Sequence, residues 1–277
     1  MYLFLDYETR SKLPIKKTGG RRYAQEATPL MAAWFFSDDP APPPPQEWEI
    51  QQWDRYSFPN APTFLLDALS DPEVTKSAFN APFEIEISRN CFNTPIYREQ
   101  WRCTMAWAYA RAFTGALADV GLALGLPASL VKDPTGGKLI QRFSTPRKPS
   151  RDNPREFFEP DDDDDAGRWS QFLFYNRQDV VAEIAIAHEL RAHPLTPAEQ
   201  DLWVWDRGVN DRGLPIDVTF AEKAAEIVDE EAERYLDEIA YITGLSNPNS
   251  RDRVLGWLQG RGVEIADLRA ETLEGML

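Results

Sequence analysis

The pattern of hydrophobic and polar positions along the chain predicts an α/β protein. Short apolar or alternating runs at Tyr2–Leu5, Leu30–Phe36 and Trp48–Trp53 predict three strands in an antiparallel meander, and Thr75–Phe79 predicts a fourth strand. Helical spacing and helix-start signals predict helices over Thr63–Leu69, Phe83–Asn90, Trp101–Phe113, Ala116–Leu124, Trp169–Arg191, Glu199–Asn210, Phe220–Ile242 and Arg251–Gln259. We therefore expect strands and helices in one fold, followed by a small C-terminal segment of helices alone.

Two segments lack either periodicity and are expected to be surface loops. They are Thr9–Arg22 and the long stretch Lys132–Gly167, in which Leu139–Phe143 is a candidate for local order. Loops of such length in compact domains are usually functional or disordered. The run Asp161–Asp165 lacks the glycine and the spaced ligands of a calcium loop, so we expect it to be solvated.

A domain boundary is expected near Pro194 and Pro197, which separate two helical patterns. This divides the chain into residues 1–194 and 195–277. In the second part, the amphipathic stretch Phe220–Ile242 has an apolar stripe. That stripe fits packing on the chain's own first domain or docking on a partner chain.

Charge and composition narrow the function classes. The chain has 45 acidic and 30 basic residues, a formal charge of −15, which argues against a generic nucleic-acid binder. However, Thr9–Arg22 contains six basic residues and no acid, and Lys132–Arg155 contains seven basic residues and two acids. Two cysteines, no leader-like N-terminus and no membrane-length apolar run predict a cytoplasmic protein.

A pair of carboxylates follows the first strand. Because side chains alternate along a strand, Asp6 and Glu8 are expected to point to the same side. Two like charges this close favour a divalent cation with oxygen ligands, such as Mg²⁺ or Mn²⁺. An acidic turn after a strand is the more ordinary interpretation of an isolated pair, so later carboxylates decide between the two.

Two later segments supply such carboxylates. Glu84 follows a strand at the start of a helix, where it could face the first pair or simply complement the helix dipole. Tyr175 and Asp179 lie four residues apart on one face of a helix, which is also a common surface pair. Each feature alone is weak evidence for a metal site.

Taken in order, these motifs resemble those of the DnaQ-like 3′–5′ exonucleases in their tyrosine (DEDDy) form. The resemblance is most specific to the proofreading domain of bacteriophage family A DNA polymerases, through DYETRS, RYA, FNAPFE, WRCTMA, GKLIQRFS and YNRQDV. The segment NDRGLPID, which begins at Asn210, resembles the passage from exonuclease to polymerase in that family. One departure is Glu84, where the wider superfamily has aspartate. The histidine form of the third motif would need a histidine where this chain has Phe174.

The resemblance implies a ribonuclease H-like mixed sheet over residues 1–194 and two-metal hydrolysis of DNA 3′ ends. It implies that Asp6 bridges two Mg²⁺ or Mn²⁺ ions, that Glu8 and Asp179 complete one site and that Glu84 holds the second ion. Tyr175 would orient the attacking water. The basic segments would bind the DNA backbone, and the expected DNA contacts are Thr9, Asn80, Lys138 and Arg142.

Two other functions compete with proofreading. An RNA-trimming exonuclease would share all of this chemistry, and a non-cutting module would grip DNA or a polymerase without hydrolysis. The carboxylates argue against the second, because without cations they would repel DNA. The exonuclease resemblance implies a frayed or single-stranded DNA 3′ end as one partner. Residues 195–277 resemble the start of a polymerase region, so we expect a polymerase domain or subunit as the other.

Overall fold

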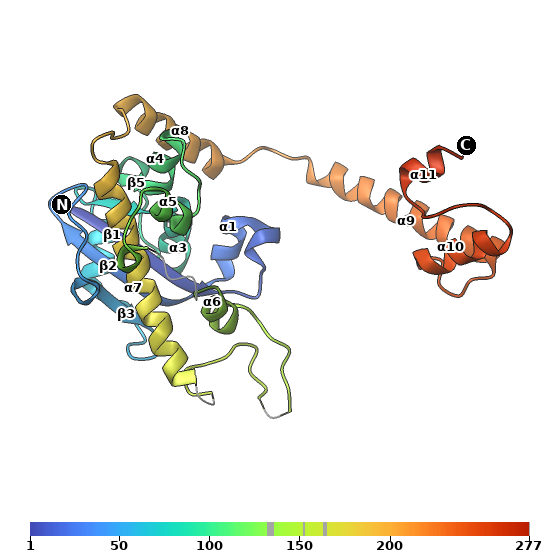
Figure 1. Ribbon diagram of the computed structural model, residues 1–277, viewed down its shortest axis with the longest axis horizontal. Helices are drawn as coiled ribbons and strands as arrows, with labels where there is room; N and C mark the ends of the chain where they lie inside the picture. The colour runs from blue at the N-terminus through green and yellow to red at the C-terminus, as the bar shows by residue number, and fades with distance from the viewer. Residues whose placement is uncertain (132–135, 152, 163–164, 277) are drawn as a thin grey trace. The chain divides into compact units, whose positions relative to one another are not determined.

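The computed structural model describes residues 1–131, 136–151, 153–162 and 165–276. A mixed five-stranded sheet lies among helices within the first 212 residues (Figure 1). The strand order is β3-β2-β1-β4-β5. β1 is antiparallel to β2, and β2 to β3, whereas β4 is parallel to both β1 and β5. The strands are β1 (Tyr2–Arg10), β2 (Thr28–Ser37), β3 (Gln51–Asp54), β4 (Thr75–Ala78) and β5 (Trp101–Cys103). The α/β class and the opening meander are therefore confirmed, and the arrangement is consistent with a ribonuclease H-like fold.

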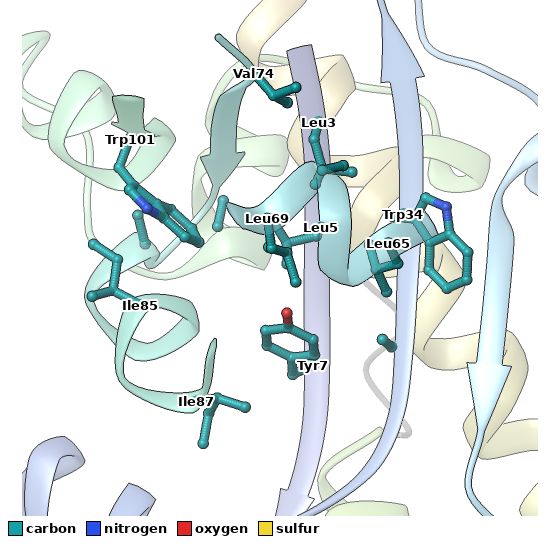
Figure 2. Close-up of a cluster of buried hydrophobic side chains, with 14 of the residues drawn as sticks. Leu3, Leu5, Tyr7, Trp34, Leu65, Leu69, Val74, Ile85, Ile87 and Trp101 are labelled. Carbon is teal, nitrogen blue, oxygen red and sulfur yellow. The ribbon is translucent and has the colours of Figure 1, made fainter. Parts of the chain in front are cut away.

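Alternate residues of β1 enter different hydrophobic cores because side chains alternate across a strand. Leu3, Leu5 and Tyr7 pack on one face, beneath α2 (Thr63–Ser70) and beside α3 (Ala81–Cys91) (Figure 2). On the other face, Phe4 packs with Val180, Val181 and Ile184 of α7 (Asp165–Leu190). Asp6 and Glu8 lie two and four residues after Phe4, so their side chains point to the same face of the sheet, toward α7.

The remaining helices fall into two groups along the chain. Within the described part of the first 212 residues they are α1 (Ile15–Glu26), α4 (Thr104–Ala110), α5 (Leu117–Ala123), α6 (Gly136–Ser144) and α8 (Pro197–Arg212), with short 3₁₀ turns η1 (Glu47–Glu49), η2 (Arg98–Gln100) and η3 (Ala128–Leu130). Toward the C-terminus they are α9 (Val218–Thr243), α10 (Arg251–Gly260) and α11 (Ala270–Glu274). In the described segments, no helix is both long enough and apolar enough to cross a membrane.

Three element predictions were wrong. The segment expected as the loop Thr9–Arg22 continues β1 and then forms most of α1, whose helical pattern is interrupted at Gly19 with φ of 75°. Only the last part of Trp48–Trp53 is a strand, since its first residues form η1. The helix expected from Trp101 begins at Thr104, because Trp101–Cys103 pairs with β4 as an edge strand.

The aspartate run is also not uniformly solvated. Asp165 is fully buried and is bonded to Arg142 and Arg168. Asp161 and Asp162 pair with Arg155, while residues 163–164 lie outside the described structure.

The chain divides into two compact units, Met1–Arg212 and Gly213–Leu277. The expected boundary at 194/195 therefore differs from the structural one, which lies after α8. That helix belongs to the first unit because Asp211 pairs with Arg89 and Arg98, and Gln200 donates to the Trp101 carbonyl. The assignment of an exonuclease domain and a polymerase-like segment stays a prediction.

The second unit consists of α9, α10 and α11. Asp217 caps α9 by accepting a hydrogen bond from the Phe220 amide, and Gly244 ends it in the left-handed conformation. The unit's own helices leave Phe220 and Ile227 largely exposed. The amphipathic helix expected over Phe220–Ile242 is thus present, with an apolar stripe that its own unit does not cover.

Candidate metal centre

β1 extends beyond its parallel neighbour β4, and the candidate site lies on this extension. The β1–β4 pairing covers Tyr2–Phe4, and β4 ends at Ala78. Asp6 and Glu8 therefore lie on the part of β1 beyond that pairing. The β1–β2 register shifts between Glu8 and Thr9, an irregularity of the kind that often re-aims side chains beside functional sites.

Helix α7 brings the third carboxylate to this place. Asp6, Glu8 and Asp179 each offer a carboxylate oxygen, and these oxygens all lie within 4.8 Å of one another. Asp179 is 3% exposed and Glu8 is 9% exposed, while Asp6 is partly buried, so the cluster is largely but not fully shielded from bulk water. The two strand residues and the helix residue are therefore brought together as the sequence predicts.

Glu84 lies beside this cluster in the first turn of α3. Burial raises the pKa of its carboxyl well above the usual range, and the charge of Asp6 raises it further. Its Oε2 is buried and has no hydrogen-bond partner among the described residues. An additional acidic group is thus held close to Asp6 with an unused oxygen.

Tyr175 precedes Asp179 by one helical turn and is 1% exposed. Burial raises the pKa of its phenol, followed by the charges of Asp179, Glu8 and Asp6 and by a hydrogen bond with Asp179. These causes all favour the neutral phenol. The hydroxyl therefore keeps its proton and is available as a hydrogen-bonding group, not as a base.

Asn176 orients Asp6, and the sequence analysis did not single it out. Its Nδ2 donates to the Asp6 carboxylate at 2.7 Å and to the Asp6 carbonyl at 3.2 Å. Its Oδ1 accepts from Gln52, and the side chain is fully buried. Groups that hold a metal-ligating carboxylate in place tune metal affinity.

Replacing Asn176 with alanine is expected to weaken metal binding roughly 10- to 100-fold. It should also lower the free energy of unfolding by about 1–3 kcal/mol, because buried polar partners lose their bonds. Titration calorimetry with Mn²⁺ and urea unfolding measure the two effects. Gln171→Ala, at an exposed position of the same helix, is the matched control. Equal Mn²⁺ affinity in both variants would contradict the assigned role.

Glu183 is a further acidic residue that the sequence analysis missed. It is 1% exposed, and its Oε1 accepts hydrogen bonds from Ser77 at 2.8 Å and Thr104 at 3.0 Å. Burial raises the pKa of its carboxyl to about 8 against those two bonds, with a contribution from the charge of Asp6. The signal was present in the sequence, since Tyr175, Asp179 and Glu183 follow one another at intervals of four residues and so lie on one face of the helix.

The four expected DNA contacts lie in different environments. Asn80 and Lys138 are exposed. Thr9 is 4% exposed, and its hydroxyl is hydrogen-bonded to Tyr23 at 2.9 Å. Arg142 binds Asp165 through Nε and Nη2, and its guanidinium lies 3.1 Å from the centre of the Phe158 ring. The contacts of Arg142 are those of a structural residue, while DNA binding by all four stays a prediction.

Loss of Arg142 should therefore destabilise the protein. Alanine at this position leaves the fully buried Asp165 with Arg168 alone, and we expect a loss of about 2–4 kcal/mol in the free energy of unfolding. Urea unfolding measures this loss, with the exposed Lys138→Ala variant of the same helix as control. A change in Arg142→Ala no larger than in the control would contradict the structural role.

The donor set suits a hard divalent cation. Carboxylate oxygens from two elements gather within one ion's reach, a third element supplies Glu84 with an unused buried oxygen, and hard cations prefer oxygen ligands. Without positive charge, so many carboxylates can share the space only if some hold protons, as the raised pKa of Glu84 indicates. The residues present therefore fit Mg²⁺ or Mn²⁺.

Comparison with known proteins shows that the chain is similar to part of a DNA polymerase. It is 33% identical over 278 residues to a DNA polymerase of Bacillus phage SP02. The match takes in 99% of this chain and 41% of that polymerase, so the chain spans less than half of its relative's length. No protein-family model matches the chain.

Proposed function

We propose that this chain is a metal-dependent 3′–5′ exonuclease that removes nucleotides from DNA 3′ ends, as the proofreading part or partner of a phage DNA polymerase. The observation that carries the proposal is the meeting of Asp6, Glu8 and Asp179 within 4.8 Å. It gains support from the charges of Asp6 and Glu8, which act on both Glu84 and Tyr175, and from similarity to a phage DNA polymerase.

The four carboxylates would form two sets of ligands, one for each of two ions. Asp6 is assigned to both ions, because its carboxylate lies within 4.8 Å of those of Glu8 and Asp179 and its charge also acts on Glu84. Glu8 and Asp179 complete one set of ligands, and Glu84 provides the other. Two divalent cations here would stabilise the entering and leaving oxygens of an in-line displacement at phosphorus.

Tyr175 has a different task. Its phenol stays protonated at neutral pH, so it orients the attacking water by hydrogen bonding and does not remove the proton itself. Its hydrogen bond with Asp179 keeps the hydroxyl next to the carboxylates.

The DNA and polymerase partners rest on further features. Lys16, Lys17 and Arg21 of α1 are exposed and offer positive charge to a phosphate backbone without reading sequence. The apolar stripe of α9, left uncovered by its own unit, suits contact with a polymerase domain or subunit.

The proposal is tested with purified protein and 5′-labelled single-stranded DNA. A 3′–5′ exonuclease should give a ladder of shortened products with Mg²⁺ or Mn²⁺ and none with EDTA, and a phosphorothioate at the last linkage should slow it. Release of the label in one step would show the opposite direction and contradict the proposal. DNA binding without any product would favour a non-cutting module, and faster shortening of a matched RNA would favour an RNA-trimming enzyme.

A further inference from the structure

The first residue of α6 lies directly against the Tyr175 ring. A Cβ built on Gly136 would overlap Cε2, Cζ and Cδ2 of that ring, all closer than the 3.0 Å that real Cβ atoms keep. Gly136 is buried, and its φ lies outside the left-handed range, so the backbone conformation does not require glycine. Glycine is needed here because the helix approaches an aromatic ring.

The other neighbours of the ring leave it little room to move. Phe172, one turn earlier on α7, stacks on Tyr175 with ring centres 6.1 Å apart and planes at 26°. Phe172 is itself packed against Phe143 of α6, with ring centres 5.6 Å apart. The phenol is thus confined by Gly136 and by an aromatic cluster that spans both helices.

Helix α6 is also fixed. Leu139 and Phe143 anchor its apolar side in the cluster that contains Tyr175, and Arg142 binds the buried Asp165 at the start of α7. A group added at Gly136 therefore cannot be accommodated by an easy shift of the helix. It must displace the ring, or break these contacts.

We propose that Gly136 is a positioning residue that sets where the Tyr175 hydroxyl lies relative to Asp6, Glu8 and Asp179. The inference rests on the proposed exonuclease function. It adds that the Tyr175 hydroxyl can take its position only because residue 136 of α6 has no side chain. An enzyme group displaced by about 1 Å can lose about 100-fold in rate.

The chain offers a matched control in the next residue. Gly137 is also in the first turn of α6, and a Cβ built there meets no atom within 4 Å. Gly136→Ala and Gly137→Ala thus make the same chemical change in the same helix, with and without contact to Tyr175. Alanine favours a helix more than glycine, so Gly137→Ala should not lower stability.

The kinetic test measures kcat and KM on single-stranded DNA for both alanine variants and for Tyr175→Phe. We expect Gly136→Ala to lower kcat roughly 10- to 100-fold with little change in KM, and Gly137→Ala to behave as wild type. In the Tyr175→Phe background, where the hydroxyl is already lost, Gly136→Ala should lower kcat by less than about 2-fold. A purely structural defect would lower kcat in both backgrounds.

Thermal unfolding tests the contact without relying on activity. Gly136→Ala should lower Tm by about 3–8 °C in wild type and in Tyr175→Phe, because the ring is present in both. In Tyr175→Ala, which lacks the ring, the same substitution should leave Tm unchanged. A drop of equal size there would overturn the inference.

Different results would contradict the role of Gly136 and the proposed exonuclease function. If wild type shortens DNA but Gly136→Ala and Gly137→Ala share the same kcat, the inference about Gly136 is wrong and the exonuclease function stands. If wild type with metal shows no shortening at all, the proposed function fails and the role of Gly136 in it fails as well.

Discussion

Replacing Asp6 with asparagine is expected to lower exonuclease activity roughly 1,000-fold or more while the fold is retained. The substitution keeps the size of the side chain and leaves an oxygen that can accept the hydrogen bond from Asn176. It removes the charge that acts on Glu84, Tyr175 and Glu183 alike. A divalent cation that is bound by Asp6 together with Glu8 and Asp179 should therefore bind much more weakly to the variant.

Metal linkage gives a second measurement of the same prediction. A ligand at 100 times its dissociation constant stabilises a protein by about 2.7 kcal/mol, which is about 5–10 °C in Tm for a unit of this size. Mn²⁺ should produce such a shift in wild type and little or none in Asp6→Asn. Asp67→Asn, an exposed position on α2, should behave as wild type in both assays. An equal Mn²⁺ shift in Asp6→Asn would show that the ion binds elsewhere.

Elements with a clear period were predicted well, and those defined by distant partners were not. α7 and α9 have strong helical patterns, and the ends predicted for each lie within about four residues of those observed. The start of β1 was predicted, but the strand continues to Arg10. β5 was taken for helix because it is three residues long and exists only through its pairing with β4. α1 was missed because Gly19 interrupts its helical pattern.

Side-chain environments were harder to predict than elements. Asp165 was expected in water as one of five consecutive aspartates, but Arg142, 23 residues earlier, pairs with it in the interior. Much of the site could be predicted because the spacing of two residues in DxE on a strand and of four in Tyr-x-x-x-Asp on a helix each place both side chains on one face. Asn176 and Gly136 carry no such signal, since their importance comes from the neighbours that the fold brings to them.

Glu183 should make the stability of the metal-free protein fall with rising pH. Its carboxyl pKa is raised from 4.5 to about 8 by burial, so the folded state holds a proton that the unfolded state releases. Below about pH 4.5 both states are protonated and the group costs nothing. Between about 4.5 and 8 unfolding releases a proton, and stability is lost progressively, with the loss complete above pH 8. At 1.36 kcal/mol per pKa unit, the shift corresponds to about 3–5 kcal/mol.

Glu183→Gln separates this effect from other titrations. Glutamine retains an oxygen for the hydrogen bonds from Ser77 and Thr104 but cannot ionise. In EDTA, its free energy of unfolding should be close to that of wild type at pH 5 and should exceed it by about 3–5 kcal/mol at pH 9. Urea unfolding across this range measures the difference, with Glu189→Gln at an exposed position of α7 as control. If the free energies of unfolding of wild type and Glu183→Gln change in parallel with pH, the carboxyl of Glu183 ionises at its ordinary pKa. Its burial beside Ser77 and Thr104 would then not raise the pKa in solution.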